Sequence, residues 1–308
     1  MKKVFIDGSA GTTGLRIHER LAERNDIELI TLTEEKRKDP LYRKEAINEA
    51  DIAFLCLPDD AAREAVSFIE NDTTVVIDTS TAHRTNEDWA YGFPELSEKH
   101  LEKIKSSKRI AVPGCHASGF IALVYPLVEK GVLPKDILLS CFSLTGYSGG
   151  GKKMIGDYES DGRDTLLDAP RIYGLSQQHK HLKEMKTISG IENFPAFLPV
   201  VGDFYSGMAV SIPLFSSQIN ASLDEIKAIY SEKYTWGMVS FKENIDINGF
   251  LSAGTYSFKD TMTVGVFGND ERFTLEAVYD NLGKGASGAA IECLNIVTGN
   301  DFSYGLAE

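Results

Sequence analysis

Residues 3 to 24 read KVFIDGSAGTTGLRIHERLAER and place a short apolar strand, a glycine-rich turn and an amphipathic helix in direct succession. Gly8, Gly11 and Gly14 form a G-x-x-G-x-x-G turn. Such a turn lets the backbone approach a pyrophosphate, and the N-terminus of the helix that follows supplies free N–H groups. We therefore predict a dinucleotide site here. A glycine-rich turn in an unrelated α/β domain is the alternative interpretation.

Strands and helices continue to alternate after this segment. Further strands are predicted over residues 27–33, 51–58, 73–80 and 109–114, and a helix with an acidic start follows at residue 59. This alternation predicts an α/β fold in which the first 115 residues form a doubly wound parallel sheet of the Rossmann type.

The chain changes character beyond Cys115. A helix is predicted up to Gly131, and another over residues 223–235. Between and after them lie runs rich in β-branched and aromatic residues, at residues 138–153, 197–215, 246–258 and 260–268. These runs predict an α+β domain with a mostly antiparallel or mixed sheet. The segment 146–153, GYSGGGKK, is predicted to be a flexible loop, and the last helix is rich in small residues.

Composition narrows the classes of partner. The chain has 308 residues, which suits about two domains, and a net charge of −13. Such acidity disfavours nucleic acid and anionic membranes as partners. No apolar run approaches the roughly 18 residues of a membrane span, and the N-terminus does not resemble a signal peptide. The four cysteines form no C-x-x-C pair, so we expect neither disulfides nor a metal site. We expect a cytoplasmic location for the same reason.

One cysteine differs from the other three. Cys115 lies in VPGCHASGF, residues 112–120, in a Pro-Gly turn directly before an apolar helix. The positive end of a helix stabilises a thiolate and lowers its pKa. Cys56, Cys141 and Cys293 lie in apolar strands or helices and suit the usual role of a buried cysteine. With a nucleotide turn in the same chain, Cys115 predicts an acyl thioester that exchanges a hydride with a nicotinamide.

A thioester mechanism also needs a proton donor and acceptor. The element HKH places His179 and His181 in a predicted loop that opens a helix, and one of them could pair with Glu184. We expect one of the two histidines to act with Cys115, and the residues leave open which. A surface H-x-H is the alternative, and no further ligand cluster accompanies the pair as a metal site would require.

The second strand is followed by a basic cluster, which bears on the choice of cofactor. Lys36, Arg37 and Lys38 suit the 2′-phosphate of NADP(H), whereas NAD enzymes often have an acidic residue there. A solvated charged loop is the alternative. The expected cofactor-binding residues are Gly8, Ser9, Gly11, Thr12, Thr13, Gly14, Lys36, Arg37, Lys38 and Pro58.

Phosphate or carboxylate oxygens of a substrate need donors as well. The segment 146–153 offers many N–H groups and two lysines, and Arg84 follows a strand end, where ligands lie in open α/β sheets. The expected substrate-binding residues are Arg84, Ser148, Gly149 and Lys152.

These motifs coincide with those of one family. The sequences FIDGSAGTTGL, ADIAFLCLPDDAAREAV, VIDTSTAHR, YGFPEL, PGC, GYSGGGKKMI, HKH, FLPVVGDFYSGM and DNLGKGASGAA run nearly from end to end. The chain resembles the shorter form of the N-acetyl-γ-glutamyl-phosphate reductases of arginine biosynthesis. The resemblance implies the aspartate-semialdehyde dehydrogenase fold, with a Rossmann domain over 1–115 and 284–308 and a catalytic and dimerisation domain over 116–283.

The resemblance also implies an activity. Cys115 would be the nucleophile, His179 or His181 the acid and base, and NADPH would reduce N-acetylglutamyl 5-phosphate to the 5-semialdehyde with release of inorganic phosphate. Homo-dimers or tetramers are implied too. Aspartate-semialdehyde dehydrogenase, an aminoadipyl-phosphate reductase and a non-catalytic NADP-binding sensor are the alternatives.

The chain departs from the family next to the nucleophile. His116, Ala117 and Ser118 stand where the family usually has Tyr-Pro-Thr. The change bears on the acyl pocket and on the pKa of Cys115, and so on substrate preference more than on the type of reaction.

Overall fold

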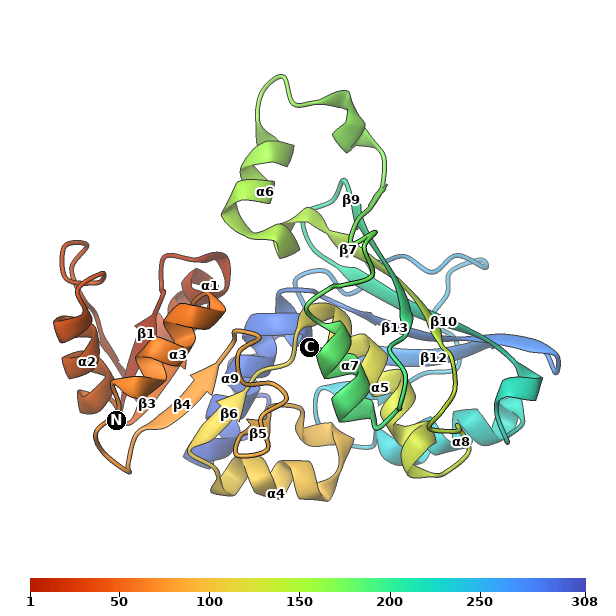
Figure 1. Cartoon of the computed structure of the whole chain (residues 1–308), viewed down its shortest axis with the longest axis horizontal. Coiled ribbons are helices and arrows are strands. Elements are labelled where there is room, and N and C mark those ends of the chain that lie inside the picture. The colour runs from red at the N-terminus through yellow and green to blue at the C-terminus, as the bar shows by residue number, and fades with distance from the viewer. The chain divides into compact units, whose positions relative to one another are not determined.

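The computed structural model describes residues 1–308, and the chain divides into two compact units (Figure 1). Unit 1 comprises residues 1–94, 98–113 and 286–306, and unit 2 comprises residues 95–97, 114–285 and 307–308. The division falls between Pro113 and Gly114, slightly before the boundary expected from the sequence, and so groups Cys115 with unit 2. No helix has the length and apolar character that a membrane span requires.

Unit 1 contains a six-stranded sheet in the order β2-β1-β3-β4-β6-β5, and all its pairings are parallel. The strands are β1 (Lys2–Asp7), β2 (Ile27–Ile30), β3 (Ile52–Leu55), β4 (Val75–Asp78), β5 (Ala90–Tyr91) and β6 (Arg109–Ala111). The core strands are buried over most of their length, as strands covered on both faces must be. This arrangement confirms the predicted doubly wound sheet.

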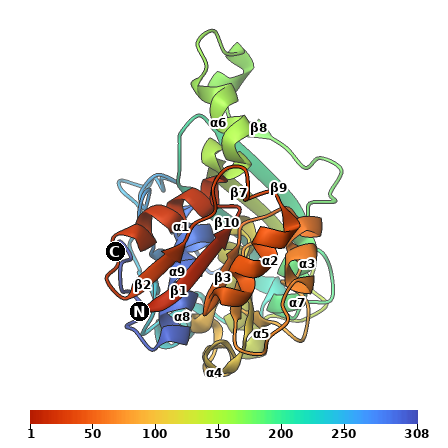
Figure 2. The same ribbon diagram turned by 90° about the vertical axis from the view of Figure 1, so that its left-hand side faces the viewer.

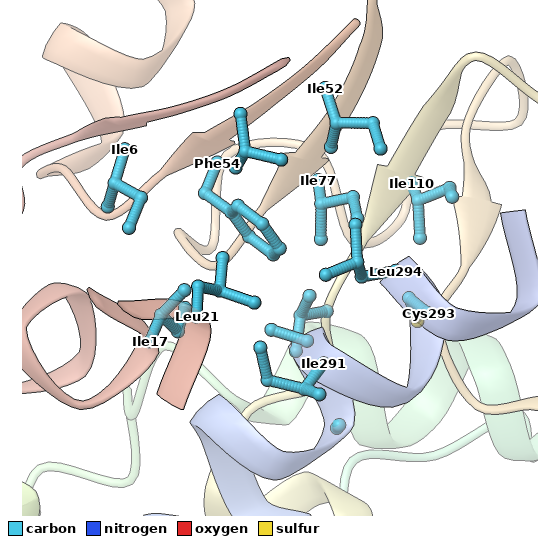
Figure 3. Close-up of a cluster of buried hydrophobic side chains, with 14 of the residues drawn as sticks. Ile6, Ile17, Leu21, Ile52, Phe54, Ile77, Ile110, Ile291, Cys293 and Leu294 are labelled. Carbon is cyan, nitrogen blue, oxygen red and sulfur yellow. The ribbon is translucent and has the colours of Figure 1, made fainter. Parts of the chain in front are cut away.

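Helices cover both faces of this sheet (Figure 2). They are α1 (Thr12–Ala22), α2 (Pro40–Glu49), α3 (Asp59–Ser67), α4 (Glu98–Ser106) and α9 (Gly288–Thr298). On one face, side chains of α1 and α9 meet those of the strands, as Figure 3 shows for Ile17, Phe54 and Ile291. On the other face, α2 and α3 bury Ile47 and Ala62 against the sheet. The C-terminal helix therefore completes the core of unit 1.

Helix α2 was not expected from the sequence. It begins at Pro40, and the Asp39 side chain caps it by accepting a hydrogen bond from the Leu41 N–H at 2.9 Å. Aspartate at the N-cap and proline at the first helical position are a standard helix start. The adjacent run of charged residues concealed this signal.

Unit 2 is built on a seven-stranded mixed sheet in the order β11-β12-β13-β10-β7-β9-β8. Its strands are β7 (Ser140–Gly146), β8 (Arg171–Ile172), β9 (Ala196–Gly202), β10 (Met208–Phe215), β11 (Val239–Phe241), β12 (Met262–Gly268) and β13 (Arg272–Tyr279). Its helices are α5 (Cys115–Glu129), α6 (Gly151–Glu159), α7 (Leu182–Ser189) and α8 (Leu223–Lys233). The central strands pair antiparallel and β7 pairs parallel with β9, which confirms a mixed sheet.

Two local predictions in unit 2 were wrong. Residues 246–258 form turns with a single isolated bridge between Ile247 and Phe250 instead of a strand, because glycines at 249 and 254 interrupt the apolar run. The segment 146–153 is not a flexible loop: Tyr147–Gly150 form a 3₁₀ turn and α6 begins at Gly151 (Figure 1).

Candidate active site

A cavity of about 320 Å³ lies in unit 1 beside the glycine-rich turn. Apolar side chains of β1 and of the segment after β2 line it, together with Gly8, Ser9, Arg37, Lys38 and Arg43. An apolar slot with a few converging cations is the composition expected for a site that takes a nucleotide with an anionic group. Two residues of the predicted basic cluster, Arg37 and Lys38, therefore face this cavity.

Lys36 lies apart from the other two basic residues. Its ammonium group sits over the Tyr42 ring, 4.3 Å from the ring centroid, and it does not line the cavity. Only two of the three basic residues therefore face the cavity, because consecutive side chains of a turn point in different directions.

The turn itself is built for close approach. Gly8 has φ +86°, a conformation that favours glycine. A Cβ atom on Gly14 would lie 2.4 Å from the Gly8 carbonyl oxygen, so only glycine allows α1 to pack on the turn. The Thr12 hydroxyl oxygen is buried at the start of α1 and has no hydrogen-bond partner. An orphaned donor at a helix N-terminus fits a phosphate oxygen. Thr13 is the next residue of α1, and Pro58 is the N-cap of α3.

This packing yields a prediction with a matched control. We expect Gly14→Ala to weaken nucleotide binding at least about tenfold, because the new methyl group must displace the turn backbone. Gly11→Ala should have a much smaller effect, since the nearest atom to its Cβ is 3.4 Å away. Titration of both variants with NADPH by fluorescence tests this. Equal affinities for the two variants would show that the tight packing at Gly14 does not shape the site.

Arg43 is a residue of this site that the sequence analysis missed. Its guanidinium pairs with Asp7 at the end of β1, with an Nη2–Oδ2 distance of 3.0 Å, and its Nη1 donates to Glu64 at 2.9 Å. Burial raises the pKa of Asp7, and the hydrogen bond and charge of Arg43 oppose that shift. Arg43 therefore compensates a buried carboxylate at the edge of the cavity. No helix had been predicted there, so nothing indicated that Arg43 would face inward.

The Arg84 side chain is buried in unit 1 and donates hydrogen bonds to backbone carbonyl groups of that unit. Its Nε donates to the Val112 carbonyl at 2.8 Å, and its Nη2 donates to the Thr79 carbonyl at 2.8 Å. These bonds tie the end of β4 to the segment after β6. Arg84 thus has a structural role here, and its predicted contact with substrate stays a prediction.

Cys115 is the first residue of α5, with Gly114 as the N-cap. Glu184 of α7 accepts a hydrogen bond from the Gly114 N–H at 2.8 Å. The phenol of Tyr279 donates to the Cys115 carbonyl and accepts from the Gly119 N–H, so it is inserted into the first turn of α5. Gly119 permits this, because its Cβ would lie 2.7 Å from the phenol oxygen. The backbone around Cys115 is thereby held from two sides.

The other three cysteines have different surroundings. Burial raises the pKa of the Cys56 thiol to about 12 and raises that of Cys141 as well. Cys293 is buried in α9, whereas Cys115 is partly exposed. Cys115 is therefore the cysteine with both a helix N-terminus and access to solvent.

The two predicted histidines lie together, next to the residue that follows Cys115. The ring centroids of His179 and His181 are 4.8 Å apart, and each lies within 6 Å of the His116 ring, at 5.6 and 5.7 Å. Phe197 of β9 packs against His116 and His179. The structure thus brings the H-x-H element against His116, the residue that directly follows the PGC turn. Glu184 accepts from the Gly114 N–H, and its expected pairing with a histidine stays a prediction.

The environment of His179 sets its protonation. Burial lowers the pKa of His179 to about 4, and the charge of Lys180 adds to the shift. The His181 backbone N–H donates to Nδ1 of His179 at 3.2 Å. Because Nδ1 accepts, the proton of the neutral ring resides on Nε2. His179 is therefore a neutral donor through Nε2 near neutral pH.

His116 is buried more deeply, with 2% of its surface exposed. Burial lowers its pKa to about 3, and the charges of His179 and Lys180 contribute. Protonation is thus strongly disfavoured in the folded chain.

A pH dependence of stability follows from this shift. Between about pH 6 and 4 the unfolded chain binds a proton at residue 116 that the folded chain does not. The free energy of unfolding therefore decreases by about 1.4 kcal/mol for each pH unit by which the pH is lowered. His116→Gln lacks this titration, and its stability should fall less steeply. Urea unfolding of both proteins at pH 7 and pH 5 measures the difference. Identical slopes would mean that His116 is protonated in the folded chain.

The remaining predicted residues lie at the 3₁₀ turn and α6 of unit 2. Ser148 is buried and accepts a hydrogen bond from Asn281 Nδ2 at 3.1 Å, and Gly149 lies beside the same amide group. Lys152 is exposed on α6. Of these three residues, only Lys152 is exposed. No cluster of three or more metal-ligating side chains is present.

Comparison with known proteins agrees with this division of the chain. A family model described as semialdehyde dehydrogenase, NAD binding domain, matches residues 3–104, and one described as semialdehyde dehydrogenase, dimerisation domain, matches residues 115–281. Among solved structures, aspartate semialdehyde dehydrogenase II of Vibrio cholerae, complexed with ASA, has a TM-score of 0.70 at 15% identity and covers 97% of this chain and 98% of its own. Aspartate semialdehyde dehydrogenase with NADP from Candida albicans has a TM-score of 0.68 at 17% identity and covers 97% of this chain and 98% of its own.

Curated relatives are closer in sequence. The N-acetyl-gamma-glutamyl-phosphate reductase of Chelativorans sp. is 48% identical over 304 residues, 96% of this chain and 97% of that protein. The reductase of the same name from Trichormus variabilis is 44% identical over 318 aligned residues, 99% of both proteins. The chain has the semialdehyde dehydrogenase fold and a cysteine at the N-terminus of α5, and it belongs to the N-acetyl-gamma-glutamyl-phosphate reductase family.

Proposed function

We propose that the chain is an NADPH-dependent reductase that converts N-acetylglutamyl 5-phosphate to N-acetylglutamate 5-semialdehyde through a thioester on Cys115. The observation that carries the proposal is the position of Cys115 at the N-terminus of α5, directly before His116, whose ring packs with the H-x-H imidazoles. The full-length likeness to reductases of this name supports the choice of substrate.

The covalent chemistry belongs to unit 2. The Cys115 thiolate attacks the acyl carbon, the carbon–oxygen bond to the phosphate group breaks, and inorganic phosphate leaves. NADPH, when bound, supplies the hydride that reduces the thioester. The oxyanion that results reforms a carbonyl as the carbon–sulfur bond breaks, so the aldehyde departs and Cys115 regains its thiolate.

The H-x-H pair supports these steps in one of two ways. His179, with its proton on Nε2, suits hydrogen-bond donation to a thiolate or an oxyanion without a change of charge. His181 is the N-cap residue of α7 and is the alternative acid and base. A rate profile tests His179: a kcat/KM limb near pH 4 that disappears in His179→Asn identifies it as the acid and base, and a limb that persists excludes it.

Unit 1 offers the groups that would hold the nucleotide. The turn at Gly8 to Gly14 and the N-terminus of α1 suit the pyrophosphate, and Arg37 and Lys38 suit a 2′-phosphate. The apolar lining of the cavity suits the adenine ring.

The reverse reaction tests the proposal. Purified protein is mixed with N-acetylglutamate semialdehyde, phosphate and NADP⁺, and absorbance at 340 nm is followed. We expect absorbance to rise continuously only when phosphate is present, with no more than one NADPH formed per chain in its absence, and to rise more slowly with aspartate semialdehyde. A folded protein that binds NADPH but turns over neither semialdehyde would contradict the proposal and favour an NADP-binding sensor.

A homodimer is part of the proposal. One face of the unit 2 sheet packs on α5 through Ser143 and Phe197, while the opposite face exposes Phe142, Leu198 and Phe215 at 41%, 40% and 58%. An apolar sheet face of this kind marks an interaction surface. The occupant we propose is a second copy of this chain, because the family model that matches residues 115–281 is described as a dimerisation domain.

Replacing apolar residues of this face tests the dimer. We expect the double variant Phe142→Asp with Leu198→Asp to be monomeric in sedimentation experiments, because a carboxylate at each position must be desolvated for the copies to associate. Leu41→Asp changes an exposed leucine of unit 1 and should leave the mass unchanged. A wild-type chain that sediments as a monomer at micromolar concentration would overturn this part of the proposal.

A further inference from the structure

His116 forms a buried link between two hydroxyl groups. Its Nδ1 lies 2.7 Å from Oγ of Ser143 on β7, and its Nε2 lies 2.6 Å from the phenol oxygen of Tyr173. Tyr173 follows β8, and its backbone N–H donates to the Pro199 carbonyl at 3.0 Å. The three side chains thus form a series of hydrogen bonds centred on His116, the residue that follows the nucleophile.

The donor and acceptor in each of these hydrogen bonds follow from counting protons. A neutral imidazole has one donor and one acceptor nitrogen. Ser143 is fully buried, and its hydroxyl has no partner other than His116. If Nδ1 carried the proton, the hydroxyl proton of Ser143 would be buried without an acceptor, which native structures avoid. The Ser143 hydroxyl therefore donates to Nδ1, and the ring proton resides on Nε2.

The same reasoning fixes the phenol. Because Nε2–H of His116 donates to the Tyr173 oxygen, the phenolic proton must point elsewhere. The bond to His116 is the one hydrogen bond that the phenol makes, and the Tyr173 side chain is partly exposed. Burial, and then the negative charge of a Cys115 thiolate, raise the pKa of Tyr173. The phenol therefore keeps its proton at neutral pH, and it is held by His116, the residue next to Cys115.

We propose that Tyr173 donates a hydrogen bond to the oxygen of the acyl group carried by Cys115, and that His116 is the positioning residue that aims this donor. The inference rests on the proposed thioester route. The phenol keeps its proton throughout, because it stabilises the negative charge on that oxygen as an oxyanion hole does. The Ser143–His116–Tyr173 link depends on histidine at position 116, because both of its ring nitrogens are used.

Steady-state kinetics in the reverse direction test the donor. We expect Tyr173→Phe to lower kcat about 100-fold with little change in the KM for the semialdehyde, the size of loss that follows removal of one oxyanion donor. Tyr256→Phe removes a phenol of unit 2 that accepts from Lys242 at 3.2 Å, and it should leave kcat unchanged. An unchanged kcat in Tyr173→Phe, with an active wild type, overturns the inference alone.

Variants at residue 116 test the link. His116→Phe should lower kcat by a similar factor, and the double variant with Tyr173→Phe should lose no more than either single change, because both remove the same donor. His116→Gln retains an N–H that can reach the phenol and should recover part of the rate. Losses that multiply in the double variant, or no recovery with glutamine, would show that His116 does not act through Tyr173. A wild type without any turnover refutes the proposed function itself.

Discussion

Cys115→Ser is expected to lower kcat by at least about 10⁴-fold while leaving the affinity for NADPH within about twofold of wild type. A serine hydroxyl does not ionise at neutral pH, so the helix N-terminus that stabilises a thiolate has no anion to stabilise. The residues that we propose to hold the nucleotide lie in unit 1 and do not include Cys115. Rapid-mixing kinetics together with NADPH titration measure both quantities on the same sample.

Cys141→Ala is the matched control for this experiment. Cys141 is buried in β7 of the same unit, and burial raises the pKa of its thiol. Its removal should lower stability by about 1 kcal/mol and leave kcat nearly unchanged. Comparable activity in Cys115→Ser and Cys141→Ala would refute the covalent route.

The second large effect concerns the cofactor. We expect the double variant Arg37→Ala with Lys38→Ala to raise the KM for NADPH about 100-fold or more and to leave the KM for NADH nearly unchanged. Each lost charge-assisted bond to a phosphate costs roughly 1.5–3 kcal/mol, and NADH has no 2′-phosphate to lose. Both side chains line the cavity beside the glycine-rich turn.

Lys36→Ala serves as the control for this pair, because its ammonium group lies over the Tyr42 ring outside the cavity lining. It should change neither KM by more than about twofold. If Lys36→Ala impairs NADPH use as strongly as the double variant, the cluster acts through its net charge and not through two directed side chains.

The sequence predicts the frame of this protein well, and the reasons are local. A glycine-rich turn between a strand and a helix is recognisable because strand, turn and helix each have their own short-range pattern, as residues 3–24 show. The position of Cys115 at a helix start follows in the same way from the Pro-Gly turn. The wrong strand at 246–258 shows the limit, because apolar content alone does not reveal whether another strand is available for pairing.

The side chains that complete the site are harder to predict, because contacts distant in sequence define them. Tyr173 precedes HKH in a polar loop, and nothing local indicates that its phenol meets His116, 57 residues away. Arg43 lies in α2, a helix that the sequence pattern did not predict because charged residues precede it. Its partner Asp7 is 36 residues away. The direction in which Lys36 points depends on Tyr42 of the next helix. Each requires the tertiary structure.

The central claim is that the acyl group is carried on the sulfur of Cys115, and intact-protein mass spectrometry tests it most directly. Enzyme is mixed with N-acetylglutamate semialdehyde and NADP⁺ without phosphate, so that an acylated enzyme has no acceptor, and the sample is quenched in acid within milliseconds to seconds. We predict one added N-acetylglutamyl group per chain, located at Cys115 by peptide mapping and removed when phosphate is supplied. The account would be contradicted if Cys115 were unmodified in every sample quenched before phosphate is added and the enzyme then turned over fully once phosphate is supplied.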